Sequence, residues 1–226
     1  MSDLIVIDYE SLGTSEDAVI LSQGIVSFKE EWLEEIQDAV DPLNTVFEEL
    51  FWRMIKNGLY LKLDVASQVK NYGRKISTDT LDWWKQQGDE AQSVLNPKPD
   101  DMSLVEMNDK TNAWLKENSN SKMKVYTRGM IDARWYQSMI EESLGLKCGK
   151  NGTIPWWNFR DVRTAVDELL AQDSNGYLPK TYKHLVDVPG LVKHDSLHDA
   201  ALDALNIVVA RILCFAPDII EEDIPF

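Results

Sequence analysis

The sequence has little cysteine and no long apolar run. Cys148 and Cys214 stand far apart, without Cys-x-x-Cys spacing or a matching Cys/His pattern, so the sequence offers no zinc site and both are expected to be inert core or edge thiols. The longest apolar runs, residues 4–7, 207–210 and 212–216, fall far short of the ~20 residues that a membrane-spanning helix needs. No basic stretch precedes the first of them, so we expect neither a signal peptide nor a membrane partner, and a cytoplasmic location.

Basic residues are also scarce. The chain has 23 Lys and Arg against 38 Asp and Glu, which gives a formal net charge of −15 and a pI near 4.6. A surface of that sign repels phosphate chains, which excludes a protein that grips long duplexes through a general basic surface. A nucleic-acid enzyme of this composition must therefore use local Arg and Lys clusters together with bound metal cations.

Length and patterning indicate a single α/β domain over residues 1–226. Hydrophobic residues make up 44% of the chain, and a chain of this size buries a core without disulfides. The periodicity predicts strands at 3–7, 18–28, 59–63, 124–126 and 157–160, and helices at 30–40, 77–87, 103–118, 134–144, 163–171 and 194–214. Residues 45–54 fit either a strand or a helix, and the pattern of residues 174–190 predicts a loop. This order favours a mixed β-sheet flanked by α-helices.

Two carboxylates follow the first predicted strand. Asp8 and Glu10 stand on alternate positions, and the period-two geometry of a strand points both to the same side. Carboxylates crowded at a buried strand end repel each other and are tolerated mainly when a hard cation neutralises them. The alternative is that both are solvated at a turn.

Two further acidic segments complete the pattern. Asp132 stands where a predicted strand runs into a helix, a place where a plain helix cap is the alternative. The last predicted helix carries His194 with Asp199 and, in a second register, His198 with Asp203. Surface polar residues are the alternative there. The three segments together are less expected by chance than any one of them.

Together these segments resemble the DEDDh exonucleases, the histidine branch of the DnaQ-like 3′→5′ exonucleases, which have a ribonuclease-H-like fold. The resemblance is closest to the phage exonuclease A group and its bacterial exoribonuclease-like relatives, and it covers nearly the whole chain. It is carried by residues 7–11 (IDYES), 80–87 (TLDWWKQQ), 128–132 (RGMID), 157–164 (WNFRDVRT) and 194–200 (HDSLHDA). Ser11, Ile131 and Ser196 replace the usual Thr, Phe and Ala, and none of these changes removes a metal ligand.

The resemblance implies a metal-dependent nuclease. Asp8, Glu10, Asp132 and Asp199 are expected to hold two Mg²⁺ or Mn²⁺ ions about 4 Å apart, and His194 to take a proton from metal-bound water. The expected reaction releases nucleoside 5′-monophosphates from single-stranded 3′ ends, with DNA slightly preferred over RNA. An exoribonuclease is the alternative, and a non-catalytic acidic interaction protein on the same fold is a second one. If phage-encoded, the protein would act in the host cytoplasm.

Other residues are candidates for substrate contacts. Trp83 and Trp84 could stack terminal bases, although one of them must lie in the core because adjacent helix positions face about 100° apart. Arg128, Arg160 and Arg163 could bind flanking phosphates, with ordinary ion pairs as the alternative.

The remaining expectations concern supporting residues. His198 and Asp203 are expected to be structural or to lie behind the metal ligands, and Asp161 to support the metal ligands or cap a helix. The remaining tryptophans of note are expected in the core: Trp52, Trp114, Trp156 and Trp157. The segment 30–43 looks like an insertion against the phage group, with no readable role.

Overall fold

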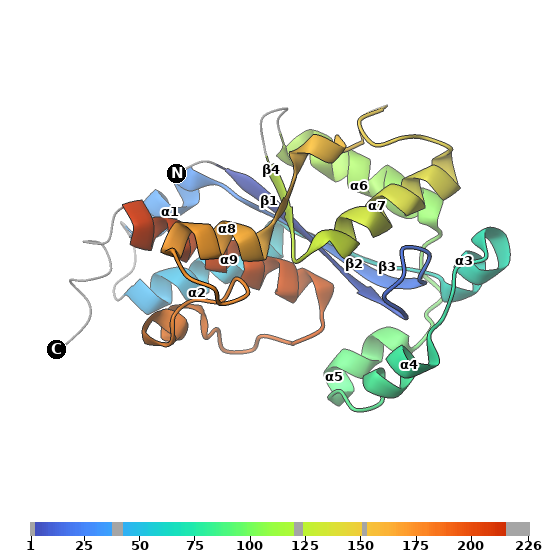
Figure 1. Cartoon of the computed structure of the whole chain (residues 1–226), viewed down its shortest axis with the longest axis horizontal. Helices are drawn as coiled ribbons and strands as arrows, with labels where there is room; N and C mark the ends of the chain where they lie inside the picture. Colours follow the sequence, from blue (N-terminus) through green and yellow to red (C-terminus); the bar gives the residue numbers. More distant parts are fainter. Residues whose placement is uncertain (1–2, 38–42, 120–123, 151–152, 216–226) are drawn as a thin grey trace.

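A computed structural model describes residues 3–37, 43–119, 124–150 and 153–215. Within these ranges, five strands form one sheet in the order β3-β2-β1-β4-β5, with helices on both faces (Figure 1). The strands are β1 (Leu4–Ser11), β2 (Ile20–Phe28), β3 (Leu59–Lys62), β4 (Lys124–Thr127) and β5 (Phe159–Asp161). β1 pairs antiparallel with β2 and parallel with β4, which confirms the predicted mixed sheet of the α/β class.

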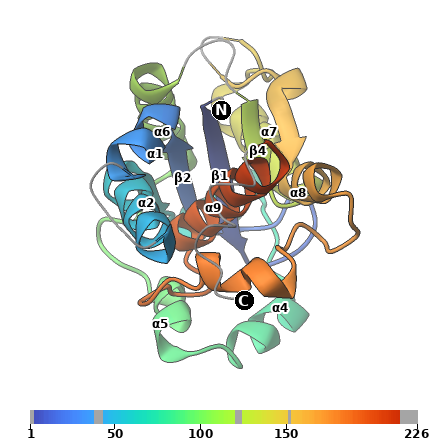
Figure 2. The ribbon, with the colours of Figure 1, turned by 90° about the vertical axis from the view of Figure 1, so that its left-hand side faces the viewer.

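The helices are α1 (Glu30–Gln37), α2 (Leu43–Asn57), α3 (Val65–Tyr72), α4 (Thr78–Trp84), α5 (Asp89–Gln92), α6 (Leu104–Asn118), α7 (Met130–Leu144), α8 (Val162–Leu170) and α9 (Ser196–Phe215). Helices α3, α4 and α5 lie to one side of the sheet, and the others cover its two faces (Figure 1 and Figure 2). Short 3₁₀ turns add Ser93–Leu95, Trp156–Asn158 and Lys180–Val186. Among the described residues, no helix has the length and apolar content that crossing a bilayer requires.

The central strand β1 is buried on both faces, which explains its unbroken apolar run. Leu4 and Val6 belong to the core beneath α2 and α9, whereas Ile5 and Ile7 belong to the core beneath α6 and α7. The same alternation places Asp8 and Glu10 on the α9 side of the sheet. The hydrophobic pattern of β1 therefore decides which helix the two carboxylates face.

Several predicted boundaries change in the structure. Residues 45–54 lie within α2, and the predicted loop 174–190 contains the 3₁₀ turn Lys180–Val186. Helix α3 was not predicted, although Asp64 caps its start and Gly73 ends it at φ 68°. Within the possible insertion 30–43, α1 is helical and residues 38–42 lie outside the described residues.

The prediction of a buried Trp156 and Trp157 is wrong. Their side chains are 68% and 55% exposed, and the two rings pack edge to face at 5.7 Å. The 3₁₀ turn that carries them precedes the edge strand β5, and neither ring belongs to a large core cluster of the described residues, whereas Phe159 of β5 does pack against one. Trp52 and Trp114 are partly buried and pack against the two cores, in agreement with the prediction.

The start of α9 lies directly against β2 at Gly24. Gly24 pairs with Asp8 across the β1–β2 ladder. A Cβ atom at this position would come within 2.2 Å of the carbonyl carbon and oxygen of Ser196. Glycine therefore lets the helix that carries the last acidic motif approach the strand next to the first one.

We expect Gly24→Ala to lower the free energy of unfolding by about 1–3 kcal/mol or more, because the backbone of α9 has to move away from the sheet. Urea unfolding of the wild type and the variant measures this difference. Gly88→Ala is the matched control, since a Cβ atom there meets nothing within 4 Å. Equal stability of Gly24→Ala and the wild type would show that the close approach of α9 to Gly24 does not require glycine.

Candidate active site

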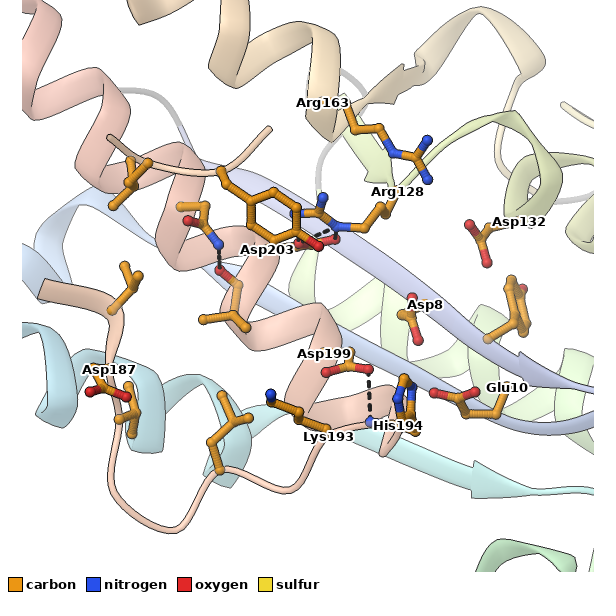
Figure 3. A pocket seen from close by; sticks show the side chains of 18 of the residues that line it. Asp8, Glu10, Arg128, Asp132, Arg163, Asp187, Lys193, His194, Asp199 and Asp203 are labelled. Atoms are coloured by element: carbon orange, nitrogen blue, oxygen red, sulfur yellow. Dashed lines mark hydrogen bonds and ion pairs between the residues drawn. The ribbon is translucent and has the colours of Figure 1, made fainter. Parts of the chain in front are cut away.

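One cavity brings the separate acidic segments together. It has a volume of about 860 Å³ and lies where the carboxyl end of β1 meets the first turns of α7 and α9. Among the residues that line it are the predicted ligands and base: Asp8, Glu10, Asp132, His194 and Asp199. In Figure 3 Asp8 lies in the middle, with the other three carboxylates around it. Residues from three distant parts of the sequence thus share one site.

The last acidic motif forms a tight turn ahead of α9. His194 adopts a left-handed backbone conformation with φ 61°, and its N–H donates to Oδ2 of Asp199 at 3.0 Å. Asp195 caps the helix by accepting from the N–H groups of Leu197 and His198. The helix predicted to begin at 194 therefore begins at Ser196. A strained backbone at a non-glycine residue is a feature of functional sites.

This turn places His194 beside two of the carboxylates. Ligand atoms of Glu10, His194 and Asp199 lie within 4.8 Å of one another, a spacing that could hold one metal ion. Burial, reinforced by the charge of Lys193, lowers the pKa of His194. A lowered pKa keeps the imidazole neutral near pH 7, which is the form that accepts a proton.

The two adjacent tryptophans of α4 have different surroundings. Trp84 is fully buried and donates its indole N–H to the carbonyl of Ser11 at 2.9 Å, so it belongs to the core. Trp83 is 41% exposed, and its ring lies 4.8 Å from that of His194 in an edge-to-face contact. Of the pair, Trp83 is therefore the one available to a base next to the predicted catalytic histidine.

The cavity concentrates negative charge away from water. Burial, followed by repulsion from the neighbouring carboxylates, raises the pKa of Asp8 and of Glu10 well above the usual range. Burial also raises the pKa of Asp132 to about 8 and that of Asp199 to about 7. Carboxylates in this position must either bind protons or bind cations. Four carboxylate groups beside one imidazole, with no cysteine or methionine among the described residues that line the cavity, fit hard divalent ions such as Mg²⁺ or Mn²⁺.

These shifts predict an unusual pH dependence of stability. A carboxyl group whose pKa is higher in the folded than in the unfolded protein stabilises the fold at low pH and loses that contribution as the pH rises through the folded value. For Asp132 and Asp199 the loss extends from about pH 4 to about pH 8. We therefore expect the melting temperature of the EDTA-treated protein to fall over this interval.

Divalent metal should reverse the loss, because it binds the deprotonated carboxylates of the folded protein only. Scanning calorimetry at pH 8 with millimolar Mn²⁺ or Mg²⁺ is expected to restore a high melting temperature, with little effect at pH 5. Asp132→Asn should flatten the decline in EDTA. A melting temperature that stays the same when metal is added at pH 8 would contradict a cation site in this cavity.

The second histidine register has structural contacts instead. The ring of His198 packs against Phe51 and Trp52 at 5.8 and 5.6 Å, and its Nδ1 accepts from the N–H of Val192 at 3.0 Å. Asp203 is buried and paired with Arg128, with Nη2–Oδ1 at 2.6 Å. This arrangement favours the register of His194 and Asp199 for catalysis.

The three candidate arginines differ in what holds them. Arg128 forms an ion pair with Asp203 and also lines the cavity, so its phosphate contact stays a prediction. Arg160 is exposed and donates to the carbonyls of its own turn. The exposed side chain of Arg163 lines the cavity and makes no hydrogen bond or ion pair within the described residues. Asp161 caps α8, as one of its two predicted roles.

The sequence did not single out several residues of the cavity wall. Tyr177, Lys183 and Lys193 line it from the segment between α8 and α9, which was predicted only as a loop. The sole local signal was the position of Lys193 directly before His194. Loop residues show no periodicity, so their approach to the site depends on tertiary packing.

Comparison with known sequences finds a family of nucleases and a phage nuclease. The sequence model of the family described as "3′-5′ exoribonuclease Rv2179c-like domain" matches residues 3–210. The exodeoxyribonuclease of Enterobacteria phage T4 is 28% identical over 216 residues, which cover 91% of this chain and 87% of the phage protein.

Solved structures agree at the level of the fold. Cell-death related nuclease 4 (CRN-4) superposes with a TM-score of 0.52 at 12% identity, and the metal-free E. coli ExoI–ssDNA complex with 0.50 at 10% identity. They cover 96% and 98% of this chain, which spans only 65% and 42% of their own lengths. These likenesses place the chain on the ribonuclease-H-like exonuclease fold.

Proposed function

The chain belongs to the 3′-5′ exoribonuclease Rv2179c-like domain family and is a 3′-5′ exonuclease, and on this premise we propose that it hydrolyses single-stranded ends with two metal ions. The observation that supports the proposal is the gathering of Asp8, Glu10, Asp132, Asp199 and His194 in one cavity. Family membership also sets aside the alternative of a non-catalytic interaction protein.

The four carboxylates would hold Mg²⁺ or Mn²⁺. Metal ions bound by these carboxylates would supply an activated water and would neutralise charge on the scissile phosphate. His194 accepts the proton of the attacking water, since its imidazole is neutral near pH 7 and borders Glu10 and Asp199. Hydrolysis breaks the bond between phosphorus and the 3′ oxygen of the penultimate nucleotide. The terminal nucleotide leaves as a nucleoside 5′-monophosphate, and the shortened strand keeps a 3′ hydroxyl.

Cations in the cavity would also offset the repulsion between a phosphate chain and a protein with a net charge of −15. A phosphate chain approaching this acidic surface meets positive charge at two places in the cavity: the metal ions and basic side chains such as Arg163 and Lys193. Binding is thereby confined to the few nucleotides at the end of a strand, which suits an enzyme that acts on ends.

The proposed polymer is single-stranded DNA, which is supported by the likeness to the phage exodeoxyribonuclease. The family description favours RNA as the second candidate. Trp83, whose exposed ring contacts His194 at the border of the cavity, would stack the terminal base.

Matched substrates test the proposal. Single-stranded DNA, single-stranded RNA and blunt duplex DNA of one sequence, each 5′-labelled, are compared by kcat/KM with Mn²⁺. We expect single-stranded DNA to be degraded fastest and the duplex slowest. A faster reaction on RNA would assign the enzyme to RNA ends. Electron paramagnetic resonance titration with a nucleoside 5′-monophosphate present is expected to count two Mn²⁺ per chain, and a count of one would overturn the two-ion mechanism.

A further inference from the structure

The catalytic cavity extends well beyond the carboxylates, to a loop between α8 and the 3₁₀ turn Lys180–Val186. Tyr177 lies on this loop and lines the cavity, yet its side chain is 57% exposed. Large aromatic side chains that are left exposed at the mouth of a binding site are commonly contact surfaces for ligands.

The loop is held by a dense set of polar contacts. Asp167 of α8 accepts from the N–H groups of Ser174 and Gly176 at 3.2 and 3.1 Å, and Gln172 donates to the carbonyl of Tyr177 at 3.0 Å. Gly176 has φ +76°, and a Cβ atom there would come 2.6 Å from Cα of Arg163. The loop is thus pressed onto α8 in a conformation that requires glycine.

A positively charged side chain, Arg128, packs against one face of the Tyr177 ring. The guanidinium carbon of Arg128 lies 4.6 Å from the ring centroid, and the same guanidinium donates to the carbonyl of Asn175 at 2.9 Å. Arg128 is itself fixed by the buried carboxylate of Asp203. A cation against one face of a tyrosine holds the ring in place and leaves the rest of it exposed to the cavity.

The ring lies at the opposite end of the carboxylates from Trp83. Figure 3 shows Arg128, Arg163 and Asp203 at one end of the site and His194 and Lys193 at the other, with Asp8 between them. Trp83 contacts His194, whereas Tyr177 contacts Arg128. A strand whose terminal base lies at Trp83 and whose scissile phosphate lies at the carboxylates therefore continues toward Tyr177.

We infer that Tyr177 stacks on a base upstream of the scissile bond, with Arg163 contacting the adjoining phosphate. This inference rests on the proposed function, because it assigns the second half of the same substrate path. Stacking on an aromatic ring tolerates every base, and Arg163 supplies a guanidinium that makes no hydrogen bond or ion pair among the described residues, although its charge acts on Asp132 and Asp203. Penultimate nucleotides would thereby contribute to binding although they are not released.

The test separates upstream from terminal contacts. An oligonucleotide reaches both ends of the site, whereas a nucleoside 5′-monophosphate, used as product inhibitor, reaches only the terminal part. For Tyr177→Ala we expect the KM of a single-stranded oligonucleotide to rise about 5- to 150-fold, the value expected from one lost base stack. Both kcat and the inhibition constant of the monophosphate should stay within twofold, which also shows that the variant is folded.

Two control variants define the outcome. Tyr177→Phe keeps the ring and should behave as the wild type, and Trp156→Ala removes a more exposed aromatic side chain that does not line the cavity. An unchanged oligonucleotide KM in Tyr177→Ala, or a monophosphate constant that rises in parallel with it, overturns the inference while the nuclease activity of the wild type stands. A wild type that hydrolyses no strand overturns the proposed function and the inference together.

Discussion

Asp8→Asn is expected to abolish detectable hydrolysis of single-stranded ends, since it removes one of the charges that would hold the metal ions. Asp8 lies in the middle of the acidic site, and repulsion from Asp132, Glu10 and Asp199 adds to burial in raising its pKa. Asparagine has nearly the same size but offers a neutral, weaker ligand. Release of nucleoside 5′-monophosphate in Mn²⁺ measures the effect.

The same variant should stay folded. Without metal, the site brings together carboxylates that repel each other, so an uncharged side chain at position 8 should raise the melting temperature in EDTA at pH 8. Glu90→Gln is a suitable control because it removes an exposed carboxylate on α5, away from the cavity. Near-normal turnover in Asp8→Asn, in the presence of a normal melting curve, would sink the metal assignment.

His194→Ala is expected to lower kcat by about 10²–10⁴-fold, the usual contribution of a positioned general base. The imidazole lies beside Glu10 and Asp199, and its lowered pKa keeps it able to accept a proton. Initial rates at saturating oligonucleotide and Mn²⁺ separate this loss from an effect on binding.

His198→Ala provides the matched comparison. Its ring is packed between α2 and the turn that precedes α9, where Nδ1 accepts from Val192. We expect this variant to lose thermal stability while kcat changes only a few-fold. A larger loss of kcat from His198→Ala than from His194→Ala would assign catalysis to the other register.

The sequence predicted that Asp8 and Glu10 lie side by side because their spacing is local, and the candidate set of four carboxylates followed from the resemblance to the DEDDh exonucleases. Asp8 and Glu10 follow a strand whose apolar run is continuous, and period two then places both on one side. The fold class followed from the order of the predicted strands and helices. What brings Asp132 and Asp199 to them is the pairing of β1 with β4 and the packing of α9, for which a single sequence carries no direct signal.

Other features depend on contacts between distant residues. Arg128 and Asp203 stand 75 positions apart, so their pairing could not be deduced from spacing. The turn at His194 interrupts a segment whose local pattern is helical, because the N–H of His194 donates to Asp199 and Asp195 caps the helix. The exposure of Trp156 likewise depends on which elements cover the edge of the sheet.

Tyr177 could not be predicted as a cavity residue for the same reason, since its position depends on contacts with distant residues. Nothing in the segment around Tyr177 distinguishes it from an ordinary surface loop until Asp167 and Arg128 are seen to hold it against the cavity. Loops positioned by a rigid scaffold carry much of the binding specificity of enzymes, and their sequences show little periodicity. Cavity-lining residues on loops were therefore harder to predict than those on strands and helices.

The most direct test of the central claim is the product pattern from one 5′-labelled single strand incubated with Mn²⁺, with EDTA, and with a blocked 3′ end in Mn²⁺. An active site of buried carboxylates in a 3′-5′ exonuclease predicts a ladder that shortens from the 3′ end in Mn²⁺ and intact strands under the other two conditions. Internal cuts, shortening from the 5′ end, or degradation that persists in EDTA would contradict it.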